Sequence, residues 1–277
     1  MKLWESIVLG IIQALGEFLP ISSSGHLALA QSLFGLDTVE NALAFDVLLH
    51  LGTLISVLAV FRRDVLLVLK AALSLIAKLF SSKRRAAGLT PYERLALCLA
   101  VALIPLVPAT LLSDRIEALM KLPAVVGALL FTNGMMLLLS ERFSRHCRDG
   151  EHMTPLHALI IGLCQAAALL PGISRSGATV TGGLSQGFTR EFSVKFSFLL
   201  SIPTVFGAAI LKLPALFSDI PDSHTLGICL AGMLAATLVG IFAIALVSFI
   251  SKRASFRGFG IYCLMVGGAA CLYACLT

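Results

Sequence analysis

The sequence predicts an all-α polytopic membrane protein with about six transmembrane helices and two re-entrant helical hairpins in an inverted-topology repeat. Hydrophobic residues make up 58% of the chain and charged residues only 13%, against roughly 25% charged residues in a soluble protein. Two segments also match without a gap, LGIIQALGEFLPISSSGH at 9–26 and IGLCQAAALLPGISRSGA at 161–178. We therefore expect a single membrane domain, 1–277, with repeat halves of about 1–148 and 153–277.

Six apolar runs approach or exceed the length of about 17–25 residues that a helix needs to cross a bilayer. They are 45–61, 95–112, 123–140, 193–213, 226–250 and 258–276. The repeat segments differ, because each is a shorter apolar stretch, a break rich in Pro, Gly and Ser, and a second apolar stretch at about 27–35 or 178–188. A helix interrupted in this way is typical of a re-entrant hairpin whose irregular backbone is buried in protein.

The segment 65–80 lies between two basic loops, and it carries Lys70, Ser74 and Lys78 at intervals of four residues. This spacing places one polar stripe on an otherwise apolar helix. The pattern favours either a helix lying in the membrane interface or a tilted continuation of the 45–61 span.

Lys and Arg in short loops mark the cytoplasmic side of a membrane protein. The basic positions are 62–63, 83–85, 142, 145, 148, 252, 253 and 257. Counting crossings between these loops, the first hairpin enters from outside and the second from inside, so their broken tips are expected to meet near the centre of the bilayer. Because the basic residues collect in such loops, the net charge of +6 does not indicate nucleic-acid binding.

The seven cysteines lie mostly inside the apolar runs, and none forms a CxxC pair. They predict small buried side chains, and they imply neither a disulfide framework nor a cysteine metal site.

The first repeat segment carries a carboxylate at membrane depth. Glu17 follows Gln13 by four residues, so both side chains share one helix face. A carboxylate there is costly unless it faces a cavity, a cation or a partner. The alternative to a functional role is an ion pair with a buried Arg that only pins two helices. We favour a functional site because Ser22, Ser23, Ser24 and His26 follow in the next turn.

Hydroxyls and backbone N–H groups at the start of a helix suit an anionic cluster of oxygens. A Ser beside a His, as in the run from Ser22 to His26, also supplies a nucleophile and its base. In the second repeat, Arg175 offers a planar fork for two phosphate oxygens. Its neighbours Ser174, Ser176 and Thr179 add hydroxyl donors. A role for Arg175 as the counter-ion of Glu17 is the alternative, and the two roles are compatible.

Together these groups indicate phosphoryl transfer inside the membrane, which depends on neutralising charge on phosphate oxygens. A hard divalent cation held by Glu17, with Gln13 as a further candidate ligand, would bridge such oxygens. The substrate should carry a lipid tail, because the surrounding walls are apolar.

The motifs QALGEFLPISSSGH and PGISRSGAT resemble the two signatures of the undecaprenyl-diphosphate phosphatase family, which is associated with bacitracin resistance. The resemblance extends over essentially the whole chain. It implies hydrolysis of undecaprenyl diphosphate to undecaprenyl phosphate and inorganic phosphate, which recycles the lipid carrier for cell-wall synthesis. It also implies a requirement for Mg²⁺ or Ca²⁺ and a location in the bacterial cytoplasmic (inner) membrane.

The resemblance also implies roles for the site residues. Gln13 and Glu17 stand at the acidic pair of the family and would hold the metal, Ser23 would be the nucleophile, His26 its base or acid, and Arg175 the phosphate clamp. The substrate-binding hydroxyls would be Ser22, Ser24, Ser174, Ser176 and Thr179. Many members have Glu where this chain has Gln13, so weaker cation binding is expected. Whether Ser23 attacks, or His26 activates a water or itself attacks, stays open.

An inverted repeat with broken helices at the midplane is also a transporter layout. A lipid-phosphate flippase or an ion-coupled transporter is therefore the alternative function. It differs from a phosphatase in holding its substrate without releasing phosphate. The expected partners are a polyprenyl diphosphate lipid, membrane lipids and, as a homodimer, a second copy of the chain, but no nucleic acid.

Overall fold

The computed structural model describes residues 1–34, 42–80, 88–120, 122–143, 148–218 and 222–276. Within these ranges the regular structure is helical. The helices are α1 (Leu3–Phe18), α2 (Ser23–Leu33), α3 (Ala42–Val60), α4 (Arg62–Leu79), α6 (Pro91–Leu103), α7 (Leu106–Thr110), α8 (Ser113–Met120), α9 (Pro123–Ser140), η1 (Gly150–His152, a 3₁₀ turn), α10 (Pro155–Ala167), α11 (Arg175–Ser185), α12 (Arg190–Ser218), α13 (Ser223–Arg253) and α14 (Arg257–Leu276).

The predicted membrane spans correspond to these helices. Five segments of the described chain are long and apolar enough to cross a membrane: 91–110, 123–140, 190–211, 223–253 and 257–275. A sixth is obtained if the bent pair of α3 and α4 counts as one span. The prediction of an all-α polytopic membrane protein is therefore confirmed. The basic positions 83–85 and 145 and Cys147 lie outside the described residues.

Helix α4 is a separate element, because it is bent by 88° from α3. Two members of its polar stripe, Ser74 and Lys78, contact the neighbouring helix α6. The Ser74 hydroxyl donates to Glu93 at 2.8 Å, and the Lys78 ammonium lies 2.6 Å from the same carboxylate. Ser74 and Lys78 thus satisfy Glu93, while Lys70 is exposed, as are Leu66, Leu69 and Leu73.

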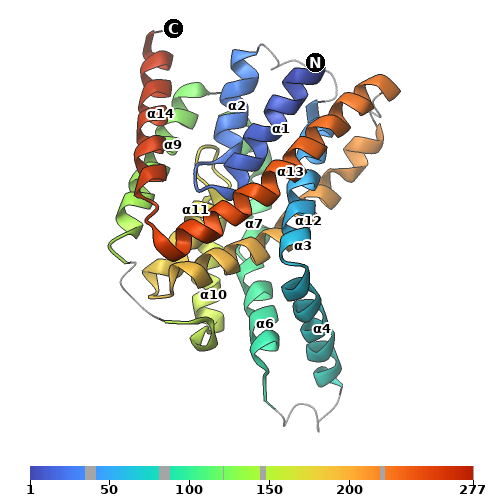
Figure 1. The fold of residues 1–277 in the computed structure, drawn as a ribbon, viewed down its shortest axis with the longest axis vertical. Helices are drawn as coiled ribbons and strands as arrows, with labels where there is room; N and C mark the ends of the chain where they lie inside the picture. Colours follow the sequence, from blue (N-terminus) through green and yellow to red (C-terminus); the bar gives the residue numbers. More distant parts are fainter. Residues whose placement is uncertain (35–41, 81–87, 121, 144–147, 219–221, 277) are drawn as a thin grey trace.

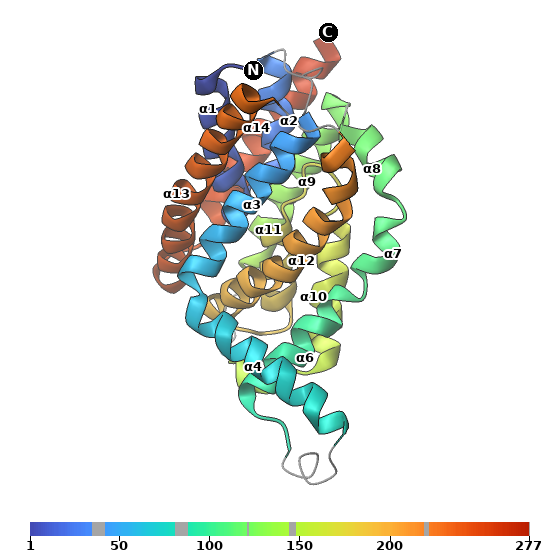
Figure 2. The ribbon, with the colours of Figure 1, turned by 90° about the vertical axis from the view of Figure 1, so that its right-hand side faces the viewer.

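The two repeat segments form hairpins that enter from opposite ends of the molecule (Figure 1). The α1–α2 hairpin lies at the end that carries both termini, and α10 rises from the other end toward α11 (Figures 1 and 2). The tips meet, because a Cβ atom added to Gly25 would lie 3.2 Å from the Cα of Gly172. This arrangement is the one expected for inverted hairpins.

Small residues let the long helices approach closely, as is common in membrane bundles. A Cβ atom on Gly10 of α1 would lie 2.3 Å from the carbonyl oxygen of Gly232 on α13, and one on Gly134 of α9 would lie 2.7 Å from that of Gly260 on α14. These contacts fix α1 against α13 and α9 against α14, and both pairs flank the hairpin tips.

Candidate active site

The first hairpin tip holds Ser23 against the helix that precedes it. Helix α1 ends before Pro20, which cannot continue its hydrogen bonding. Ser22 then adopts a left-handed φ of 74°, and its hydroxyl accepts from the Gly25 N–H at 3.3 Å at the start of α2. Gly16 has no side chain at the contact, where a Cβ atom would lie 2.5 Å from the Cα of Ser23. Ser23 therefore begins α2 directly beside the last turn of α1.

The second tip repeats this construction. Gly172 has a φ of 106°, and a Cβ atom there would lie 2.6 Å from the carbonyl oxygen of Val126. Ser174 caps α11, since its hydroxyl accepts from the Gly177 N–H at 3.1 Å. Arg175 is consequently the first residue of α11, at the positive end of that helix.

Glu17 is the centre of the site. The Ser23 hydroxyl donates to Glu17 Oε2 at 2.8 Å, and the Gln13 amide donates to the same oxygen at 3.3 Å. The other oxygen, Oε1, forms an ion pair with the guanidinium of Arg175. The Glu17 side chain is 6% exposed and that of Arg175 is 20% exposed, so the arginine is the member of the pair that an entering ligand reaches. Four predicted residues from the two repeats thus meet.

The predicted hydroxyls of the second repeat mainly brace its tip. The Ser174 and Ser176 hydroxyls lie 3.0 Å apart, and Ser176 donates to the carbonyl oxygen of Leu19 at 3.3 Å. Thr179 donates to the carbonyl oxygen of Arg175 at 2.8 Å, and its hydroxyl lies 2.6 Å from that of Ser197 on α12. In the first repeat, the Ser22 and Ser24 hydroxyls are 3.4 Å apart.

His26 is turned toward α14. Its Nδ1 bonds the carbonyl oxygen of Ser22 at 2.8 Å, so Nδ1 carries the proton and Nε2 accepts from the Tyr262 hydroxyl at 2.9 Å. The two rings stack with centroids 5.5 Å apart. The structure thus joins Ser23 to Glu17 and His26 to Tyr262, whereas the sequence analysis paired Ser23 with His26.

Asn133 on α9 is a site residue that the sequence analysis missed. It is fully buried, its Nδ2 donates to the carbonyl oxygen of Pro20 at 3.0 Å, and its Oδ1 accepts from the Ser174 N–H at 3.0 Å. A single amide therefore joins both hairpin tips. An amide within the apolar 123–140 run was the signal that could have identified it. Tyr262 gave no such signal, because no pattern in the sequence connects it with His26, 236 positions away.

Glu17 and Gln13 fit a hard divalent cation as part of its ligand set. The Oε1 atom of Gln13 is buried, and it has no hydrogen-bond partner among the described residues. Within that part of the chain, no group of three His, Cys, Asp or Glu side chains could hold a metal by itself. One carboxylate and one amide oxygen resemble Mg²⁺ sites that are completed by substrate phosphates and water.

The fold and the site together define a class of protein. A carboxylate-bound hydroxyl, an arginine and the N-termini of two short helices meet at the tips of opposed hairpins, inside a bundle of membrane-spanning helices. Such a site can bind the oxygens of a phosphate group and present a nucleophile to it. The molecule is a multi-pass membrane protein equipped for chemistry on an anionic group.

Comparison with known proteins identifies the family. The chain belongs to the family described as bacitracin resistance protein BacA, which matches residues 6–269. A relative from Alkaliphilus metalliredigens, named undecaprenyl-diphosphatase, is 37% identical and covers 100% of both chains. Relatives with the same name from Methanobrevibacter smithii and Rubrobacter xylanophilus are 41% and 40% identical, and they cover 96% and 95% of this chain and 96% and 94% of their own length.

Proposed function

We propose that the protein hydrolyses undecaprenyl diphosphate to undecaprenyl phosphate and inorganic phosphate. Relatives that match almost the whole chain carry the name of this activity. The observation that carries the proposal is the contact of the Ser23 hydroxyl with Glu17, whose carboxylate also pairs with Arg175. This trio supplies a nucleophile, a proton acceptor and a cation for phosphate oxygens at one point.

In the first step, the Ser23 oxygen attacks the terminal phosphorus of the diphosphate. Its proton passes to Glu17, the carboxylate that it contacts at 2.8 Å. The bond from that phosphorus to the bridging oxygen breaks, and undecaprenyl phosphate leaves with the bridging oxygen. Arg175 moves from Glu17 to the phosphate oxygens, where its planar fork offsets their charge.

In the second step, a water molecule attacks the phosphorus of the phosphoserine. The bond to the Ser23 oxygen breaks, Glu17 returns to that oxygen the proton it accepted in the first step, and inorganic phosphate leaves. His26 is the second proton carrier, and it serves the water or the leaving lipid phosphate. Its Nδ1 is held by Ser22, so Nε2 is the atom that exchanges the proton.

A divalent cation, Mg²⁺ or Ca²⁺, would be held by Glu17 and Gln13 and would offset the charge of the diphosphate. The tail of the substrate extends along the apolar helices, whose outward faces lie against membrane lipid. We place the protein in the bacterial cytoplasmic membrane, with the termini outside, because the basic loops of the sequence favour the inner side.

The test is phosphate release from a polyprenyl diphosphate by the purified protein in detergent, with and without EDTA. The wild type should release phosphate in a metal-dependent manner, and Ser23→Ala should not. Ser185→Ala is the matched control, since among the described residues that hydroxyl bonds only the Gly182 carbonyl, at the far end of α11.

A second measurement distinguishes attack by Ser23 from attack by a water molecule that His26 activates. Acid quenching during turnover should trap phosphate on Ser23 if the serine attacks, and no phosphoenzyme should form if His26 activates a water. A well-folded wild type that binds the lipid and releases no phosphate would instead favour the lipid-phosphate flippase or ion-coupled transporter. The hairpins enter from opposite ends, as they do in many transporters, and this observation supports the second function.

A further inference from the structure

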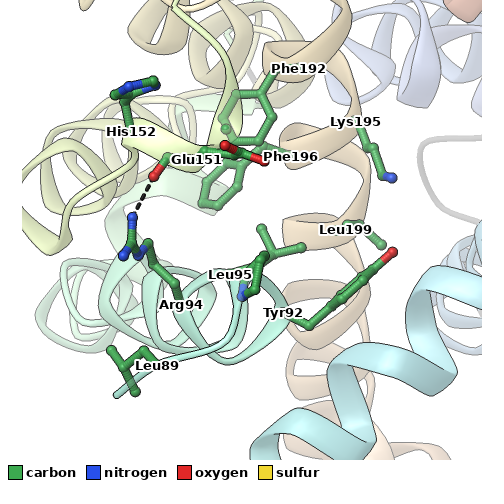
Figure 3. Close-up of a pocket in the computed structure, with 12 residues that line it drawn as sticks. Leu89, Tyr92, Arg94, Leu95, Glu151, His152, Phe192, Lys195, Phe196 and Leu199 are labelled. Atoms are coloured by element: carbon green, nitrogen blue, oxygen red, sulfur yellow. Dashed lines mark hydrogen bonds between the residues drawn. The ribbon is translucent and has the colours of Figure 1, made fainter. Parts of the chain in front are cut away.

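A cavity of about 610 Å³ lies between α6, α12 and η1 (Figure 3). The membrane spans of α6 and α12 begin at Pro91 and Arg190, so the cavity occupies the first turns of two spanning helices. The lining residues run from Leu89 to Leu95, from Gly150 to His152 and from Phe192 to Leu199, and none of them belongs to the candidate active site. Helix α6 begins toward the end of the molecule opposite the termini (Figure 1), and the start of a spanning helix is where lipid headgroups are expected.

The deep wall of the cavity is apolar. Phe196 and Leu199 are 1% and 3% exposed and belong to a buried core cluster, and the rings of Phe192 and Phe196 lie 6.0 Å apart. The opposite wall is made by Leu95 of α6 (Figure 3). Gly150 allows η1 to rest on Phe192, because a Cβ atom there would lie 2.2 Å from the ring. Hydrocarbon bound here would meet carbon surfaces on several sides.

The rim of the cavity is polar and mostly neutralised. Lys195 Nζ lies 2.7 Å from Asp64 Oδ1, and the Tyr92 hydroxyl donates to the same oxygen at 3.3 Å. His152 Nδ1 lies 2.7 Å from Asp149. These contacts fix two sides of the opening and compensate two of its basic groups.

One cation and one anion on the rim have no charged partner among the residues that the structure describes. The Arg94 guanidinium donates to the backbone carbonyl of Glu151, which is a neutral group (Figure 3). Among the described residues, the ion pairs include neither Arg94 nor the Glu151 carboxylate. The opening therefore presents both signs of charge above an apolar wall.

We propose that this cavity binds a phospholipid with a zwitterionic headgroup that ends in a primary ammonium. The phosphodiester contacts Arg94, whose guanidinium is suited to phosphate oxygens. The ammonium contacts Glu151, and the acyl chains cover the partly exposed side chains Phe192, Leu95 and Leu89, beneath which Phe196 and Leu199 form the floor. A lipid with a net negative headgroup would fit less well, because its extra charge would lie near the Glu151 carboxylate. The cavity volume is within the usual range for ligand sites.

The proposal does not depend on the phosphatase activity, and binding alone tests it. The purified full-length protein is titrated in detergent with phosphatidylethanolamine, phosphatidylcholine or phosphatidylglycerol, and retained lipid is counted by native mass spectrometry. Phosphatidylethanolamine should be retained at one molecule per chain and more tightly than the other two. Arg94→Gln should weaken its binding about tenfold, the factor that corresponds to about 1.4 kcal/mol, and Glu151→Gln should remove the preference for ethanolamine over glycerol.

Arg62→Gln is the matched control, because Arg62 is also exposed and donates to a backbone carbonyl, that of Ala59. Its binding should equal that of the wild type. Leu95→Trp tests the cavity independently of charge, since the larger ring fills it and should abolish retention. Equal retention of the three lipids by the wild type and all variants would show that the retained molecules are lipids bound nonspecifically around the protein. That result would overturn the proposal. Equally tight binding of soluble phosphoethanolamine would assign the cavity to a soluble ester and would also overturn it.

Discussion

Asn133 accepts a 3.0 Å hydrogen bond from the backbone N–H of Ser174, in the second hairpin, while its own amide N–H donates to the carbonyl of Pro20 in the first. The two repeats are therefore held in register by a side chain that belongs to neither hairpin. Since Ser174 immediately precedes Arg175, this bond positions the arginine relative to Glu17.

Asn133→Ala should reduce both stability and turnover. It leaves the buried N–H of Ser174 without its acceptor, which costs about 1–3 kcal/mol. The Pro20 carbonyl loses the amide and keeps the weak thiol donor Cys263 at 3.9 Å. The melting temperature should fall, and kcat measured well below that temperature should fall by about tenfold or more, because a small displacement of catalytic groups is costly. Asn133→Asp keeps the acceptor for Ser174 but places a carboxylate oxygen against the Pro20 carbonyl, so it should not restore activity. Normal kcat in both variants would show that the amide only adds stability.

Arg175→Lys should lower kcat/KM by about 100-fold or more, the usual effect of removing a donor that stabilises developing charge. A lysine keeps the positive charge but cannot contact two phosphate oxygens with one planar group. The measurement is phosphate release at varied concentrations of the lipid diphosphate, with Arg62→Lys as the exposed control. Activity close to that of the wild type would mean that Arg175 acts only as the counter-ion of Glu17.

Gln13→Glu should lower the cation concentration needed for half-maximal activity by about tenfold, provided that Gln13 and Glu17 hold the metal. The substitution adds a second carboxylate next to Glu17, one helical turn away, and Mg²⁺ and Ca²⁺ favour carboxylate oxygens. Titration of activity with Mg²⁺ and Ca²⁺ after removal of metal by EDTA provides the comparison. Gln165→Glu is the control, because Gln165 occupies the matching position in the second repeat. An unchanged titration in Gln13→Glu would place the cation elsewhere.

The fold was predictable because its signals are local. Broken helices at Pro20 and Pro171, and apolar runs between basic loops, are readable in the chain itself. The meeting of Glu17, Ser23 and Arg175 was predictable from the repeat. The hydrogen-bond partners of the individual side chains were not predictable. The turn at Ser22 directs Ser23 to α1 and His26 to α14, and that orientation depends on a left-handed residue and on close packing against Gly16.

The same limit applies to residues that act from outside the motifs. Asn133 and Tyr262 lie 113 and 236 positions from their partners Pro20 and His26, so no local pattern connects them. The cavity between α6, α12 and η1 is a further example. Its rim carries charges of both signs only because folding brings Arg94 and Glu151 together.

The orientation in the membrane can be tested with single cysteines in a variant without the seven native ones. Asp222 is an exposed residue at the start of α13, which crossing counts place outside. Glu151 lies in the turn η1, is exposed, and is placed inside by the same counts. An impermeant thiol reagent should label Asp222→Cys in intact cells, and it should label Glu151→Cys only after permeabilisation. Both variants should label fully in detergent, which shows that each thiol is reachable. The reverse pattern in intact cells would show that the molecule has the opposite orientation. The α1–α2 hairpin would then open to the cytoplasm, and the diphosphate would have to enter from the inner leaflet.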